Sequence, residues 1–243
     1  MSTDLPVIDM KYRFAFGWSA NVFFEAFKRN IHYDKLVYLS DIKILEIGAS
    51  KASIISIIFD HPSNAITVSS FPEKIVDETR EYFFSLTKVC QLKSSYQFRS
   101  IDVREIDEKY DLIIMKSVLG GVFSSDQFSQ KDVFEFIEKS LANHLRPGGH
   151  IISLDNGKSF LDSILSKARV GSYNSFWNYF EVDQYPSSFD VSSFGLITMA
   201  DFKNRVPILG TFIQLVVDFL DRYLCKIIPT YPTVIVSVYK KRD

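Results

Sequence analysis

The chain has 243 residues, of which 47% are hydrophobic and 23% are charged, and its formal net charge at pH 7 is −1. This length fits a single α/β domain with additions and is sufficient to bury a sizeable core. The 28 Lys and Arg residues nearly balance the 29 Asp and Glu residues without a long basic run, which argues against nucleic acid as a partner. We therefore expect a small-molecule substrate, and we leave monomer and homodimer open.

Cysteine usage and hydropathy bear on location. The two cysteines, Cys90 and Cys225, are far apart and lack metal-type spacing, which favours a reducing compartment, the cytoplasm, and predicts no metal site. The N-terminal segment lacks the basic start of a signal peptide, so we expect no export. Polar residues interrupt the apolar segment 206–228, which predicts an amphipathic helix on the sheet instead of a transmembrane span; membrane-surface docking is the less favoured alternative. Its predicted inner face comprises Phe212, Val216, Phe219, Leu220, Tyr223, Leu224 and Ile227.

The first region of the chain is rich in aromatic residues. Residues 15–31 have a helical pattern ahead of the first strand, and we expect a helical lid over residues 1–40. Trp18 in this segment is a candidate substrate contact, although packing in the core or lid is the favoured alternative.

A buried strand followed by a turn of small residues opens the central region. Residues 42–47 are almost continuously apolar, as in a strand covered on both faces. Gly48, Ala49 and Ser50 then keep side chains small, so that backbone N–H groups at the start of the next helix can approach a ligand. Glu46 lies at the carboxyl end of this strand, where open α/β sheets bind their ligands.

Four more strands follow in alternation with helices. The strands are predicted at residues 64–68, 98–101, 110–115 and 150–154, and the main helices at 73–88 and 129–144. Short connections between alternating strands and helices predict a parallel sheet with right-handed crossovers, so every ligand-facing turn lies at one edge.

The remainder of the chain differs in character. Late strands at 195–199 and 233–239 flank the amphipathic helix and can add an antiparallel pair to the sheet. The sequence as a whole predicts a single α/β domain, a Rossmann-like three-layer sandwich with a mostly parallel seven-stranded sheet. Its parts are the lid (1–40), a cofactor-binding core (41–157), an aromatic-rich cap (158–194) and a strand–helix–strand unit (195–243).

Four motifs occur in order, at residues 45–52, 68–73, 101–103 and 144–149. In this order they resemble the class I S-adenosylmethionine-dependent methyltransferases over about residues 40–157. The loop 116–121 and the segment 177–179 are similar, more weakly, to small-molecule methyltransferases among bacterial surface-glycan and secondary-metabolite enzymes.

This resemblance implies S-adenosylmethionine as the cofactor and assigns roles to individual residues. Glu46 and Gly48 would lie at its methionine end, Asp102 and Val103 at its adenine, and Lys116 and Ser117 beside the sulfonium. The full set of implied cofactor contacts is Glu46, Gly48, Ala49, Ser50, Ser69, Ser70, Asp102, Val103, Lys116 and Ser117.

The chain departs from the family pattern at two places. Ser50 and Ala52 stand where the family usually has glycine, and Ser69 replaces the acid that normally binds the ribose hydroxyls. A hydroxyl makes weaker bonds than a carboxylate, so cofactor affinity is expected to fall. The same positions argue against a nicotinamide dinucleotide as the ligand. Its binding motif needs glycine where this chain has Ser50 and Ser53, and an acid near Ser69.

Methyl transfer requires that an oxygen or nitrogen nucleophile be placed near an activated methyl group while water is excluded. Lys116 is the candidate catalytic residue, because burial at a strand end can depress the pKa of a lysine; it can alternatively hold an anionic substrate or extend into solvent. No histidine is a clear general base. The candidate substrate contacts are Trp18, Asn156, Lys158, Trp177 and Tyr179, and a structural cap explains the aromatic pair 177 and 179 equally well.

Two functional hypotheses follow. The first is methyl transfer to an oxygen or nitrogen of a small molecule, such as a sugar or glycan precursor. The alternative is a catalytically inactive methyltransferase-like protein with a binding or regulatory role, which the altered glycine turn and Ser69 favour. A different enzyme on the same fold is a third, less favoured case.

Overall fold

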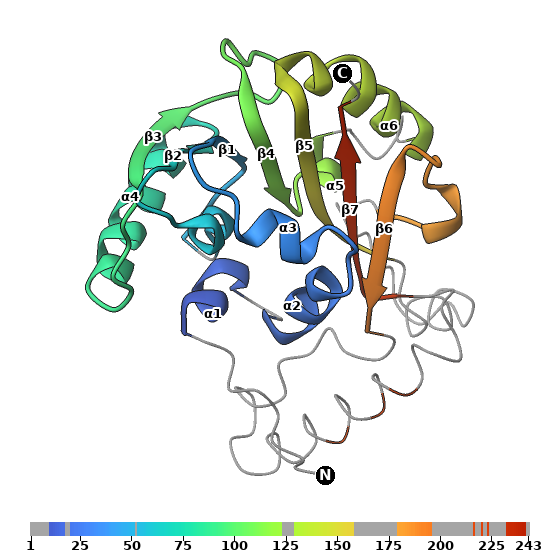
Figure 1. Cartoon of the computed structure of the whole chain (residues 1–243), viewed down its shortest axis with the longest axis horizontal. Helices are drawn as coiled ribbons and strands as arrows, with labels where there is room; N and C mark the ends of the chain where they lie inside the picture. Colours follow the sequence, from blue (N-terminus) through green and yellow to red (C-terminus); the bar gives the residue numbers. More distant parts are fainter. Residues whose placement is uncertain are drawn as a thin grey trace.

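The computed structural model describes residues 10–17, 20–51, 53–122, 129–157, 179–195, 216, 220, 223 and 232–241. These residues form a sheet with helices on both faces (Figure 1). The strands are β1 (Lys43–Ile47), β2 (Ala65–Ser70), β3 (Ser95–Ser100), β4 (Tyr110–Lys116), β5 (Leu145–Asn156), β6 (Phe189–Phe194) and β7 (Val234–Lys240). The helices are α1 (Met10–Phe16), α2 (Ala20–Lys28), α3 (Tyr33–Val37), α4 (Glu73–Thr87), α5 (Leu119–Val122) and α6 (Gln130–Lys139), with short 3-10 helices η1 (Ile55–Phe59), η3 (Leu141–His144) and η4 (Val182–Gln184).

The seven strands have the order β3-β2-β1-β4-β5-β7-β6. Strands β1 to β5 pair in parallel, whereas β7 runs antiparallel to both of its neighbours, β5 and β6. The predicted α/β class and the mostly parallel seven-stranded sheet are therefore confirmed. The order reverses after β1, which pairs with β2 on one side and β4 on the other, so a switch point lies between β1 and β4.

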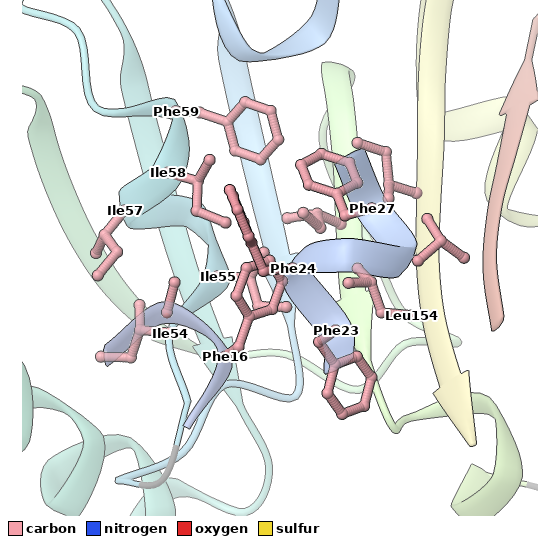
Figure 2. Packing of buried hydrophobic residues seen from close by; sticks show 14 of the residues in the cluster. Phe16, Phe23, Phe24, Phe27, Ile54, Ile55, Ile57, Ile58, Phe59 and Leu154 are labelled. Carbon is pink, nitrogen blue, oxygen red and sulfur yellow. The ribbon is translucent and has the colours of Figure 1, made fainter. Parts of the chain in front are cut away.

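Each face of the sheet carries its own hydrophobic cluster. On one face, α1, α2 and η1 bring together a group of aromatic and aliphatic side chains that includes Phe16, Phe23 and Phe27 (Figure 2). On the other face, α6 packs Val133, Phe134 and Ile137 against the sheet. Burial on both faces explains why β1 and β4 read as nearly continuous apolar runs in the sequence.

Several predicted elements differ from the observed ones. The helix expected directly after β1 is the 3-10 helix η1, all five residues of which are buried. Four of these five residues are Ile or Phe, which have lower helix propensity than Leu or Ala. The single helix predicted at 15–31 is divided between α1 and α2, because the chain adopts a positive φ of 60° at Gly17.

The end of the chain contains two further corrections. A strand that was not predicted, β6 at Phe189–Phe194, lies inside the segment expected to be a cap. Residues 196–199 of the strand predicted at 195–199 lie outside the described residues. Residues 216, 220 and 223 are helical as predicted, but Val216, Leu220 and Tyr223 are 41%, 39% and 60% exposed, so these three do not pack against the sheet. Periodicity identifies an apolar face of a helix but not what covers it. The other residues of that predicted face lie outside the described residues.

Candidate functional site

Polar side chains gather at the carboxyl ends of the parallel strands, on both sides of the switch point. Glu46 is the second-last residue of β1, and Lys116 is the last residue of β4. Ser69 and Ser70 end β2, and Asp155 and Asn156 end β5. All six are buried, with exposures of 8% or less. Buried ionisable groups grouped at a ligand-binding edge mark a candidate functional site.

The Glu46 carboxylate is fully engaged by η1. One oxygen accepts the backbone N–H of Ile55 at 2.7 Å, and the other accepts the N–H of Ser56 at 2.8 Å and its hydroxyl. Burial raises the pKa of Glu46 to about 7, although these hydrogen bonds and the nearby Lys116 oppose the increase. Glu46 therefore holds the start of η1 in place under the turn, and its predicted contact with the cofactor stays a prediction.

The turn after β1 depends on Gly48. This residue is exposed and has φ +75°, a conformation that disfavours other residues. A Cβ atom here would lie 2.4 Å from Cγ2 of Val118, in the loop after β4. Only glycine therefore lets the β1 turn pass this close to the β4 loop. Ala49 donates its N–H to the Ser69 carbonyl at 2.9 Å, and Ser50 and Ser53 close the turn through reciprocal backbone bonds.

The serines at the end of β2 bind this turn instead of facing solvent. The Ser69 hydroxyl donates to the Glu46 carbonyl at 2.7 Å, and the Ser70 hydroxyl donates to the Ala49 carbonyl at 2.6 Å. Ser69 is 0% exposed and Ser70 is 2% exposed. Both hydroxyls hold β2 against the turn, and the ribose contact assigned to Ser69 stays a prediction.

Beyond β3, Asp102 and Val103 occupy the same edge. Val103 is buried, whereas Asp102 is partly exposed and accepts the N–H of Arg104 through Oδ1 at 2.9 Å. The Ile101 N–H donates to the Ser70 carbonyl, which brings this loop beside the end of β2. The structure thus places a carboxylate and an apolar side chain together where the adenine was predicted.

Lys116 lies beneath the leader helix α2. Its Nζ is 4.4 Å from the centroid of the Phe23 ring, and Phe23 lies over the strands of this face (Figure 2). Burial lowers the pKa of Lys116 to about 8, although Glu46 and Asp155 oppose the decrease. The predicted depression of the pKa by burial is present, and the alternative of a lysine extending into solvent does not hold because the residue is 8% exposed.

The end of β5 carries a buried carboxylate with an unused oxygen. Asp155 is 0% exposed, and Ser153 donates its hydroxyl to Oδ2. Its Oδ1 atom has no hydrogen-bond partner among the residues described. Burial raises the pKa of Asp155 to about 7, while Ser153 and Lys116 oppose the increase.

Three other oxygens of residues near the ends of β4, β5 and β7 share this property. Ser117 Oγ, Asn156 Oδ1 and Thr233 Oγ1 are likewise buried and lack a hydrogen-bond partner within the described part of the chain. Ser117 also has φ +52°, an uncommon conformation for serine. Sequence reasoning missed Thr233, because no motif surrounds it and only the pairing of β7 with β5 brings it to this edge.

The other predicted substrate residues are placed as follows. Tyr179 is partly buried and precedes Phe180, whose N–H donates to the Asn156 carbonyl at 3.0 Å. Tyr179 therefore lies close to the end of β5. Trp18, Lys158 and Trp177 lie outside the described residues.

Two other features are absent from the described residues. They contain no group of three or more His, Cys, Asp or Glu side chains arranged to hold a metal ion. Within the same residues, no helix has the length and apolar character required to span a membrane.

Comparison with solved structures identifies the fold. Magnesium protoporphyrin IX methyltransferase from Synechocystis PCC 6803, crystallised with bound SAH, superposes with a TM-score of 0.51 at 14% identity, covering 85% of this chain and 81% of that chain. A Bacillus halodurans C-125 protein assigned to the methyltransferases superposes with a TM-score of 0.50 at 13% identity, covering 86% and 96%. The chain has the class I methyltransferase fold. The predicted fold relationship is confirmed.

Sequence comparison adds no assignment to this fold. No protein-family model matches the chain, and no curated protein matches it. Coclaurine N-methyltransferase superposes at 10% identity with a TM-score of 0.39. The match covers 56% of this chain and only 36% of that enzyme's chain.

Proposed function

We propose that this chain is an S-adenosylmethionine-dependent methyltransferase that acts on an oxygen or nitrogen of a small molecule. The observation that carries this proposal is the β3-β2-β1-β4-β5-β7-β6 sheet with buried ionisable groups at the carboxyl edge around the β1–β4 switch point. Open α/β sheets bind their ligands at such a point. The cytoplasm is the proposed location.

The residues at this edge fit such a cofactor. Gly48 supplies an exposed turn without a side chain at the end of β1. Asp102 and Val103 supply a carboxylate and an apolar surface beyond β3 for the adenosine end. When bound, the cofactor supplies a methyl group already activated by a sulfonium, so the protein's task is to orient the acceptor and exclude water.

Lys116 is the proposed catalytic residue. Its burial beneath Phe23 removes water from the end of β4, and burial lowers its pKa to about 8. A group that titrates close to neutral pH is suited to taking up the proton that an acceptor loses on methylation.

Calorimetric titration with S-adenosylmethionine and S-adenosylhomocysteine tests the proposal. We expect both to bind, and we expect Asp102→Ala to weaken binding by about tenfold, the effect of losing one charge-assisted hydrogen bond. Asp77→Ala is the matched control, because Asp77 is exposed on α4 and forms an ion pair with Arg80, one turn along the same helix. Failure of the wild-type protein to bind either compound at high micromolar concentration contradicts the proposal.

A second candidate function has one observation in its favour. The Ser69 hydroxyl is committed to the Glu46 carbonyl, so the β2 position that usually carries an acid offers no carboxylate to a ribose. This favours a protein that binds a nucleoside ligand without turnover. Mixing the protein with S-adenosylmethionine and a small-metabolite extract distinguishes the two: formation of S-adenosylhomocysteine supports the enzyme, and binding without product supports the inactive module.

A further inference from the structure

The leader helix α2 places the ring of Phe23 over the buried ammonium group of Lys116, at the end of β4. We propose that Phe23 is a positioning residue for Lys116: its ring face holds the Nζ atom in place and stabilises the ammonium form that results when Lys116 takes up a proton. This inference rests on the catalytic role proposed for Lys116 and adds a residue of the leader to it.

Strand alternation puts the two side chains on the same face of the sheet. Ile114 belongs to the hydrophobic cluster that also contains Phe23, and Lys116 is two residues further along β4, so both strand residues point to the same side. The Lys116 Nζ atom is 4.4 Å from the centroid of the Phe23 ring, and an aromatic ring attracts a cation within about 6 Å. Phe23 is 0% exposed and Lys116 is 8% exposed, so solvent weakens this attraction little.

The packing of α2 fixes the position of the Phe23 ring. The ring of Phe16, from α1, stacks against it with an interplanar angle of 8° and a centroid distance of 6.3 Å. Further along α2, the carbonyl of Ala26 accepts the hydroxyl of Ser192, in β6, at 2.8 Å. The helix is thus attached to α1 and to β6, and the ring is held rigidly relative to the end of β4.

A lysine needs such a fixed partner if it is to act on a bound substrate. Its four-carbon side chain is flexible, and its ammonium group is a compact charge without a preferred direction. Glu46 from β1 and Asp155 from β5 attract this charge. The Glu46 carboxylate already accepts the N–H groups of Ile55 and Ser56, and the ring face adds an attraction that does not compete with these bonds.

Phe23 acts on the pKa of Lys116 in two opposite ways. Its ring covers the Nζ atom and excludes water, which disfavours the charged form, whereas the electron density on its face favours that form. Exclusion of water is the larger effect, because burial lowers the pKa of Lys116 to about 8 even though Glu46 and Asp155 oppose the decrease. The two effects can be separated by weakening the ring face without changing the shape of the side chain.

Ring fluorination at Phe23 makes this separation, because fluorine draws electron density from the ring face and changes its size little. Phe23 is replaced by phenylalanine with one, two or three ring fluorines in the full chain without ligand. The pKa of Lys116 is then measured by NMR titration of isotope-labelled lysine side chains, with Lys116→Arg identifying the signal. We expect the pKa to fall with each added fluorine, by about 0.5 to 1 in total, which corresponds to the loss of one cation–π contact.

Two further variants complete the test. Phe23→Ala removes the cover together with the ring, so water reaches Nζ and the pKa of Lys116 should rise from about 8 toward its ordinary value of 10.5, opposite in direction to fluorination. Fluorination of Phe27 is the matched control, because this residue is one turn further along α2, is 1% exposed and packs its ring against those of Phe16 and Tyr33. It should leave the pKa of Lys116 unchanged.

The fluorinated chains keep the test informative if Phe23→Ala does not fold. A pKa of Lys116 that stays constant or rises as fluorine is added at Phe23 overturns the inference, and so does an equal decrease on fluorination of Phe27. Either result leaves the proposed function intact, because binding of S-adenosylhomocysteine is measured separately. Failure of the wild-type protein to bind that compound overturns the proposed function and leaves the measured effect of Phe23 on Lys116 standing.

Discussion

The two halves of the carboxyl edge differ in how their buried polar groups are satisfied. At β1 and β2, Glu46, Ser69 and Ser70 all have short hydrogen bonds to the backbone of the turn or of η1. At β4, β5 and β7, Ser117, Asp155, Asn156 and Thr233 each keep an oxygen without a partner among the described residues. The β1–β2 half is a structural frame, whereas the β4–β5–β7 half keeps buried acceptors that the described residues do not use.

This difference has an energetic consequence. A buried hydrogen-bonded group that loses its partner costs about 1–3 kcal/mol, whereas removing a group that has no partner costs little. Stability should therefore fall when the β1–β2 half is altered and change little when the β4–β5–β7 half is altered. The predictions below test this contrast, from the largest expected effect to the smallest.

The Gly48→Ala variant should lose the most stability. The substitution places a Cβ atom 2.4 Å from Val118 Cγ2 at a residue with φ +75°. Left-handed backbone and overpacking together cost about 2–5 kcal/mol. The free energy of unfolding in urea measures the loss, and the Gly48→Ala/Val118→Ala double variant should recover the steric part. A loss below about 1 kcal/mol in the single variant would show that the frame is not rigid.

Glu46→Gln compared with Asp155→Asn tests the contrast between the halves directly. Glu46→Gln places an NH₂ group against the donors of Ile55 or Ser56, so we expect a loss of about 2–3 kcal/mol in the free energy of unfolding. Asp155→Asn removes a buried carboxyl with one unpartnered oxygen, so its effect should be within about 1 kcal/mol. Equal losses in the two variants would remove the contrast.

The dependence of stability on pH provides a third test. Burial in the folded protein raises the pKa of Asp155 from its ordinary value of 3.8 to about 7, so the folded protein binds this proton more tightly than the unfolded chain does. The contribution of Asp155 to stability is therefore largest below about pH 4 and is lost as pH rises toward 7. Between pH 5 and 7 the wild-type protein should lose about 2 kcal/mol more than Asp155→Asn, at about 1.4 kcal/mol for each pH unit. Parallel curves for the two proteins would contradict this assignment.

The smallest expected effect compares two hydroxyls. Ser69→Ala removes the bond to the Glu46 carbonyl and should cost about 1 kcal/mol. Thr233→Val removes a hydroxyl that has no partner among the described residues and replaces it with a methyl of similar size, so stability should stay the same or rise. Thermal unfolding of both variants beside the wild type measures the difference, and a larger loss in Thr233→Val would reverse the proposed roles.

Much of the fold could be predicted from the sequence, because burial on both faces leaves a plain apolar pattern. The strands around Ile44, Ile66 and Ile113 fall where alternation and turn residues predicted them. The position of β6 could not be predicted, since Phe189–Phe194 carries no periodicity that separates it from the aromatic segment before it. The exposure of Val216 and Tyr223 could not be predicted either, because it depends on what lies against the helix.

The candidate site was predicted by position and only partly by role. Strand ends predicted that Glu46, Lys116 and Asn156 would meet at one edge, and they do. The sequence does not show that the Glu46 and Ser69 side chains bind neighbouring backbone, because hydrogen-bond direction depends on the path of the turn. Thr233 became part of the site only through the antiparallel pairing of β7 with β5.

A crystal structure with S-adenosylhomocysteine tests the central claim most directly, because it shows at which strand ends the ligand binds. We predict density across the ends of β1 and β4, with the adenine beside Asp102 and Val103 and with Asp155 Oδ1 outside contact distance of the ligand. A ligand centred on β5 and β7 in contact with Asp155, or no ligand at saturating concentration, would contradict a cofactor site at the β1–β4 switch point.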